Sequence, residues 1–110
     1  MALITLTDAK AYLHVDTADE DATISVLLSS AERLCADVAR LSVSQWNDVN
    51  GSAEQTEEYD APYLSHVREL MKIAILYTVG YLYEHREEAD HHDLTLTLRA
   101  ILSSIREGVV

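Results

Sequence analysis

Residues 60–88 read DAPYLSHVRELMKIAILYTVGYLYEHREE, and this stretch decides which fold the chain can adopt. Its apolar residues recur every three or four positions, which places them on one side of an α-helix. Pro62 suits the start of such a helix, because the amide that proline lacks has no helical partner in the first turn. The stretch therefore predicts one helix from about Asp60 to Glu88, roughly 40 Å long. Its predicted inner stripe consists of Leu64, Val67, Leu70, Met71, Ala74, Tyr77, Thr78, Tyr81 and Leu82.

The middle of this helix is apolar on more than one side. Between Ile73 and Tyr83, further apolar residues stand off the inner stripe, at Ile75, Leu76, Val79 and Tyr83. A helix that is apolar all round is normally buried all round. A chain of 110 residues has little else with which to cover it. We therefore expect a neighbouring subunit to cover part of this helix.

A second long helix is predicted from about Asp19 to Leu41. Thr17 and Glu20 fit a capping box before its first turn, in which hydroxyl and carboxylate each bond a free backbone amide. Its apolar stripe has an unbroken helical spacing and comprises Ile24, Leu27, Leu28, Ala31, Leu34, Cys35 and Val38. The opposite side is polar, as a solvated or subunit-facing surface should be, and carries Ser25, Ser29, Ser30, Glu32, Arg33, Asp37 and Arg40.

Shorter elements flank these two helices. A short N-terminal helix is predicted from about Asp8 to His14, with Thr7 as its N-cap. Residues 42–60 lose the helical period and contain several turn-forming residues and an acidic run, so they predict a long loop. Trp46 in this loop either anchors a partner or folds back on the core. Loops of this length in compact domains are often functional.

The last segment, from Asp93 to Glu107, begins with alternating leucines at positions 94, 96 and 98 and then changes to helical spacing. It predicts a short extended stretch leading into a helix that Gly108 ends as a C-cap. The chain is thus expected to be a single all-α domain over residues 1–110. We expect a small bundle of two long antiparallel helices, with a short N-terminal helix and a C-terminal helix.

The composition restricts the classes of function. Eight Lys and Arg stand against nineteen Asp and Glu, giving a formal charge of −11 and a pI near 4.6. Such a field repels phosphate backbones, so conventional nucleic-acid binding is not expected, although a protein that surrounds DNA without gripping it would benefit. Residues 1–5 lack the pattern of a signal peptide, and residues 73–83 are too short for a membrane span, so a cytosolic protein without a membrane segment is expected.

Two features of the sequence could indicate a metal site or a nucleophile. Glu88 and His91 match the Glu-x-x-His element of di-iron bundles, and His85 and His92 lie nearby. That architecture needs a second such element, which the chain lacks, so exposed histidines at a helix end are the preferred interpretation and no metal or cofactor is expected. Cys35 lies on an apolar stripe, where burial raises a thiol pKa and suppresses reactivity. No catalytic residues are predicted.

Four segments resemble the head-tail connector family of tailed bacteriophages, also described as DNA-packaging adaptors. They share their order and spacing with that family and are ITLTDAKAYLHVD at 4–16, DED at 19–21, YEHRE at 83–87 and LRAILSSIR at 98–106. The resemblance runs from Ile4 to Arg106. The sequence departs from the family pattern at His85, where Asn is usual, in lacking a Gly-Arg pair after the second helix, and in lacking a Pro near Leu96.

The resemblance implies a structural subunit of the virion neck, present in the host cytoplasm during assembly. Its members assemble as a ring, dodecameric in the virion, beneath the portal protein, and they receive the next neck or tail connector and retain packaged DNA. The resemblance also favours an interface role for Tyr83, Glu84 and Arg86, although Arg86 could instead pair with neighbouring glutamates. With Trp46, these are the candidate interface residues.

Two other classes of function remain open. An acidic DNA mimic would present carboxylates to a nucleic-acid enzyme as a monomer or dimer, whereas a connector forms rings that depend on concentration. A metal-dependent helical enzyme would hold stoichiometric metal at Glu88 and His91.

Overall fold

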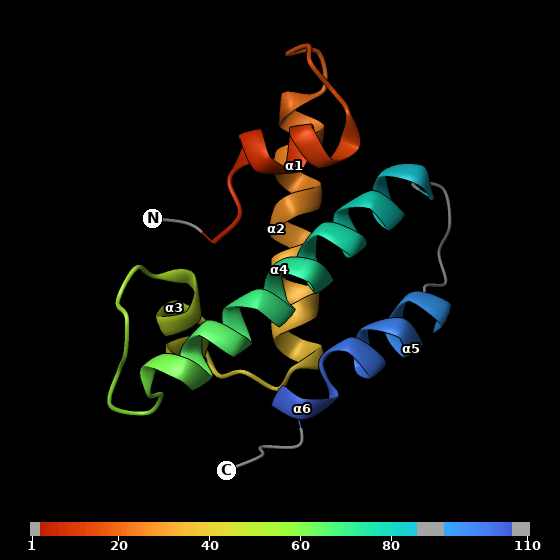
Figure 1. Ribbon diagram of the computed structural model, residues 1–110. Coiled ribbons are helices and arrows are strands. Elements are labelled where there is room, and N and C mark those ends of the chain that lie inside the picture. Colours follow the sequence, from red (N-terminus) through yellow and green to blue (C-terminus); the bar gives the residue numbers. More distant parts are fainter. Residues whose placement is uncertain (1–2, 86–91, 107–110) are drawn as a thin grey trace.

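The computed structural model describes residues 3–85 and 92–106, and within them every regular element is a helix (Figure 1). The all-α class is therefore confirmed for the described residues. In chain order the helices are α1 (Leu6–Leu13), α2 (Asp21–Val38), α3 (Val43–Asn50), α4 (Ala61–Glu84), α5 (His92–Ile101) and α6 (Ser103–Arg106).

Helices α2 and α4 form the centre of the molecule, and the contact between them is the most extensive in the fold. Figure 1 shows α4 inclined across α2, so the expected side-by-side antiparallel bundle is not confirmed. Side chains with no solvent exposure fill the contact, among them Ile24, Ala31 and Cys35 from α2 and Leu64, Met71, Ala74 and Thr78 from α4. Burying such apolar side chains contributes roughly 1.5–3 kcal/mol each, which makes this seam the main source of stability.

Helix α4 is covered more completely by its own chain than its sequence suggests. Ile75 and Val79, which stand off the inner stripe, have no solvent exposure, because α1, α2, α3 and α5 all contact α4. Only Ile73 and Tyr77 remain as exposed large apolar residues on this helix, at 57% and 38% exposure. The part of α4 that a neighbouring subunit could still cover is therefore the strip of Ile73 and Tyr77.

The predicted 42–60 loop is wrong for its first half, which is helix α3. The Ser42 hydroxyl accepts from the Gln45 amide at 3.1 Å, and the Gln45 side chain accepts from the Ser42 amide at 2.8 Å. This Ser-x-x-Gln capping box satisfies two amides that the first turn leaves free. Val49 is fully buried and fixes α3 to the core. The loop itself is limited to residues 51–60.

The predicted N-caps of α1 and α2 are both wrong. Helix α1 has Thr5 at its N-cap, in a capping box with Asp8, so Thr7 is not the cap. Helix α2 begins at Asp21 without a side-chain cap bond, so the capping box of Thr17 and Glu20 does not form.

The long helix begins as expected, because Asp60 caps the Tyr63 amide at 2.9 Å and Pro62 stands in the first turn. It ends at Glu84 with His85 as its C-cap, and the remaining predicted turn to Glu88 lies outside the described residues.

The C-terminal leucines are helical from the start, so the predicted extended stretch is wrong. Leu94 and Leu98 stand one helical turn apart and are both fully buried, whereas Leu96 points outward and is 49% exposed. In a helix, Leu94 and Leu98 lie on the same side and both enter the core, while Leu96 lies on another side. The predicted C-cap, Gly108, lies outside the described residues.

Candidate assembly surfaces

The predicted interface residues do not form one site. Trp46 on α3 is partly buried against the core and lines a hollow at the C-terminal end of α2. The Tyr83 hydroxyl donates to the carboxylate of Glu20 at the N-terminal end of α2. Helix α2 has 18 residues, so these two places are roughly 27 Å apart along its axis. Glu84 is exposed near Tyr83, and Arg86 lies outside the described residues.

The outer side of α2 is hollowed along its length. A shallow hollow of about 580 Å³ lies over α2, because serines stand where larger side chains would fill the space. Val26 borders it with 64% exposure. We define the α2 face as the five outward residues Val26, Ser29, Ser30, Arg33 and Asp37.

A second hollow, of about 460 Å³, shares Ser29, Arg33 and Asp37 with the first and continues onto α3, where Val43 and Trp46 line it. Glu32 stands in this second hollow with its carboxyl half-buried, and burial raises its pKa. The hollowed surface therefore runs from the middle of α2 to Trp46, which gives Trp46 a place at its edge.

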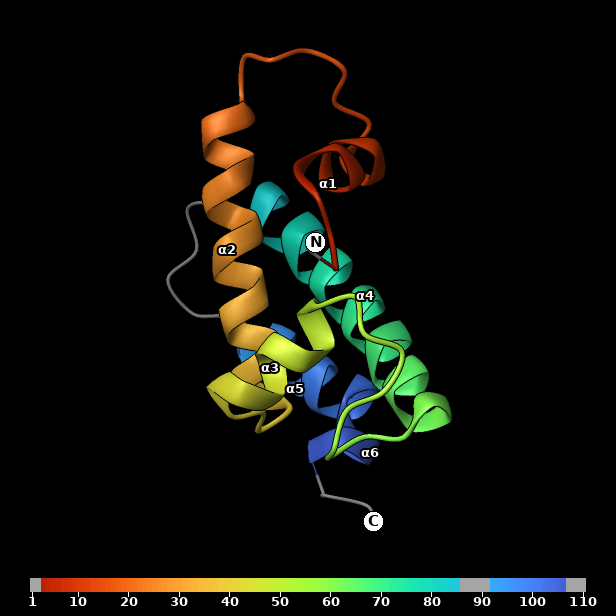
Figure 2. The same ribbon diagram turned by 90° about the vertical axis from the view of Figure 1, so that its left-hand side faces the viewer.

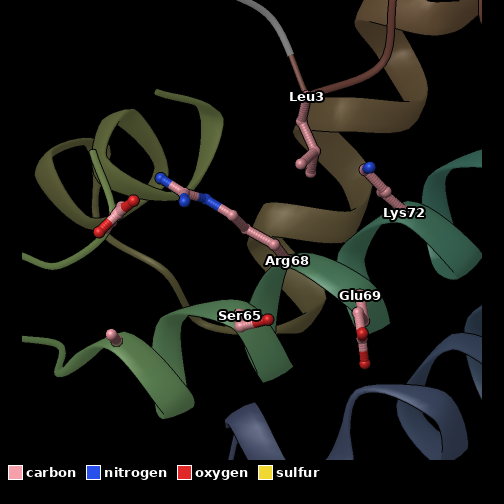
Figure 3. A pocket seen from close by; sticks show the side chains of 7 residues that line it. Leu3, Ser65, Arg68, Glu69 and Lys72 are labelled. Carbon is pink, nitrogen blue, oxygen red and sulfur yellow. The ribbon is translucent and has the colours of Figure 1, made fainter. Parts of the chain in front are cut away.

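The outer side of α4 presents larger side chains than the serines of the α2 face. Glu69, Ile73 and Tyr77 are all exposed, and their spacing of four residues places them one above another on the same side of the helix. Figure 3 shows the Glu69 side chain pointing away from Arg68 and Lys72. We define the α4 face as Glu69, Ile73 and Tyr77, with His66 one turn before them.

A third hollow, of about 470 Å³, lies between the N-terminal segment, the 51–60 loop and α4 (Figure 3). Arg68 lines this hollow, but its guanidinium already makes hydrogen bonds within the chain. Its Nε donates to the Val49 carbonyl and its Nη2 to the Asp48 carbonyl, both at 2.9 Å, at the C-terminal end of α3. A cation there satisfies free carbonyls and the helix dipole together. Arg68 therefore holds α3 on α4, and we assign it a structural role rather than a ligand-binding one.

The single thiol belongs to the interior. Cys35 has no solvent exposure, and burial raises the pKa of its thiol to about 11. The Thr78 hydroxyl donates to the Ala74 carbonyl at 2.8 Å, so the contact of 3.5 Å between Cys35 Sγ and Thr78 Oγ1 is best described as the thiol donating to the hydroxyl. The interpretation of Cys35 as a core residue is confirmed.

The structure assigns no metal centre within residues 3–85 and 92–106, where no group of three or more His, Cys, Asp or Glu could hold an ion. Glu88 and His91, the pair considered from the sequence, lie outside this part of the chain. None of the described helices combines the length and the apolar character needed to cross a membrane.

Comparison with known proteins gives one match. A family model described as phage gp6-like head-tail connector protein matches residues 3–107. No curated protein and no solved structure matches the chain.

Proposed function

The chain belongs to the phage gp6-like head-tail connector family, and from this membership we propose that it forms a ring joining the portal to the neck or tail. The observation that carries the proposal is the extent of the match, which covers residues 3–107 and agrees with the resemblance from Ile4 to Arg106. The family is one of structural phage connector proteins, not of enzymes. A structural role in virion assembly follows from that membership.

The charge of the chain supports the way in which such a ring would meet DNA. A net charge of −11 on each subunit gives a negative field that repels phosphate, so DNA could pass through the opening without adhering. Retention of packaged DNA is then a matter of closing the opening with the next connector rather than of binding.

The proposal includes the location and partners that the resemblance implies. The ring lies in the virion neck, contacts the portal on one side and the next neck or tail connector on the other, and has twelve subunits in the virion. Free subunits are in the host cytoplasm during assembly.

A measurement of solution mass tests the proposal. Light scattering over a concentration series, followed by negative-stain imaging of the heaviest fraction, is expected to show mass rising with concentration and annular particles. A strict monomer at every concentration would contradict ring formation. It would instead favour the acidic DNA mimic, for which the check is stoichiometric binding to a nucleic-acid enzyme.

A further inference from the structure

The two outer faces lie on opposite sides of the molecule. Helices α2 and α4 bury the sides that they turn toward each other, so their exposed sides point in opposite directions. Figure 2 shows this arrangement edge-on, with α2 on one side of the fold and α4 on the other. Each face keeps exposed apolar side chains, Val26 on α2 and Ile73 with Tyr77 on α4.

We propose that the α2 face of one subunit receives the α4 face of a second copy of this chain, and that this contact builds the ring. The inference rests on the proposed function and deepens it by naming the surfaces that meet. The α2 face has a shallow hollow and the α4 face carries exposed large apolar side chains, so side chains of the second can enter the hollow of the first.

The side chains of the two faces differ in size. The small side chains of Ser29 and Ser30 leave the hollow of about 580 Å³ on α2. On α4, Ile73 stands out with 57% exposure between Glu69 and Tyr77. Placing Ile73 over the two serines would bury an apolar side chain that its own chain leaves in water, which is favourable by about 25 cal/mol per Å² of apolar surface removed.

The charges match in the same register. Arg33 and Glu69 are both exposed, and within the described residues neither has a hydrogen bond or an ion pair. Val26 and Arg33 are seven residues apart on α2, roughly 10.5 Å, while Tyr77 and Glu69 are eight residues apart on α4, roughly 12 Å. Two antiparallel helices therefore bring Arg33 to Glu69 and Val26 to Tyr77 at the same time.

The next turn continues this register. Asp37 follows Arg33 on α2, and on α4 the position opposite it is taken by His66, which is exposed. The charged and polar groups thus lie at one end of the apolar contact of Ile73, as they do at the rim of a protein interface, and the pair of Val26 and Tyr77 lies at the other end.

The position of the two faces determines the symmetry. A contact between two different surfaces is heterologous, and each added subunit presents a free surface for the next. Such a contact closes into a ring when the rotation per subunit divides a full turn. A contact of one face with itself would stop at a dimer.

Charge reversal tests the contact. Arg33→Glu and Glu69→Arg each place like charges together, and each is expected to weaken assembly more than about tenfold. The double variant R33E/E69R restores the opposite charges and is expected to restore the ring. Arg99→Glu on α5 and Glu57→Arg in the 51–60 loop change the net charge equally at exposed positions outside both faces, so they serve as controls.

The outcomes separate the two levels of the proposal. If the wild-type protein forms no ring, the proposed function fails and this contact fails with it. If the wild-type protein forms rings and R33E assembles as well as R99E does, or if R33E/E69R does not recover, only the contact is overturned. Circular dichroism of each variant checks that the fold is unchanged.

Oxidative cross-linking tests the symmetry directly. A variant with both Ser29→Cys and Ile73→Cys is expected to give a ladder of covalent multimers, whereas each single variant gives none. Cys35 can stay in place because it is fully buried. A covalent dimer from a single variant, or no ladder from the double variant in a ring-forming preparation, would overturn the heterologous contact.

Discussion

The inner and outer sides of α4 present the same residue type in opposite settings. Ile75 is packed inside the fold and has no solvent exposure, whereas Ile73, two positions earlier, is 57% exposed. The inner side is complete within one chain: its apolar groups are packed, and the hydroxyl of Thr78 has its partner. The outer side leaves apolar and charged groups in water. In the proposed ring, one side of this helix serves folding and the other serves assembly.

The largest expected difference in stability is between the alanine variants of Ile75 and Ile73. Ile75→Ala removes buried methylene groups and leaves a cavity, so it is expected to lower the free energy of unfolding by about 2–5 kcal/mol. Ile73→Ala is expected to change it by less than about 0.5 kcal/mol and to reduce the oligomer mass instead. Urea denaturation and light scattering check the two effects. Equal losses of stability would contradict the division between the sides.

Two arginines make the same comparison for charged groups. Arg68→Met removes the side-chain donor of the Val49 carbonyl and leaves the Asp48 carbonyl with only the Gly51 amide at 3.3 Å, and its expected loss of unfolding free energy is about 1–3 kcal/mol. Arg33→Met, on the α2 face, is expected to leave stability within about 0.5 kcal/mol. Hydrogen exchange should also show faster opening of α3 in the Arg68 variant alone. Protection of α3 equal to that of the wild type would refute the role given to Arg68.

A smaller loss of stability is expected from removing the N-cap of α3, the helix that carries Trp46. Ser42→Ala removes the acceptor for the Gln45 amide and is expected to destabilise the protein by about 1 kcal/mol. Ser44→Ala is a suitable control, because Ser44 is exposed and does not cap the helix. Thermal unfolding of the two variants should differ, and identical midpoints would show that the capping box contributes nothing.

Cys35, which is buried, gives a test of the same comparison by pH and by thiol labelling. Burial raises the pKa of Cys35 to about 11, so the stability that the neutral thiol contributes is complete below its unfolded pKa and is lost as pH rises through the folded value. The free energy of unfolding should therefore fall more steeply between pH 9 and 11 in the wild type than in Cys35→Ala. In native monomer at low concentration, a thiol reagent should modify Ile73→Cys at once and Cys35 only on unfolding. Rapid labelling of Cys35 would contradict its burial.

The long helices were predictable because their apolar period repeats over many turns. Helix α3 was not, since its eight residues include several turn formers and its one clear signal, Ser42 followed by Gln45, was outweighed. The extended stretch was predicted wrongly because the alternation of Leu94, Leu96 and Leu98 is typical of a strand. Only the packing shows that Leu96 is the exposed one. Sequence could indicate a polar outer side on α2, but not its hollow.

The candidate site was less predictable than the fold. Trp46 and Tyr83 are individually plausible contact residues, yet they lie at opposite ends of α2, which no local pattern reveals. The α4 face was hidden inside a stretch that is apolar on all sides. Only the packing of α1, α2, α3 and α5 separates Ile75 from Ile73.

Native mass spectrometry of the wild-type protein across a concentration series tests the separation of folding from assembly most directly, because it resolves every species. A heterologous contact predicts folded monomer at low concentration and one closed ring size at high concentration, with no dimer that persists. A dominant dimer that grows no further, or a monomer at every concentration, would contradict it.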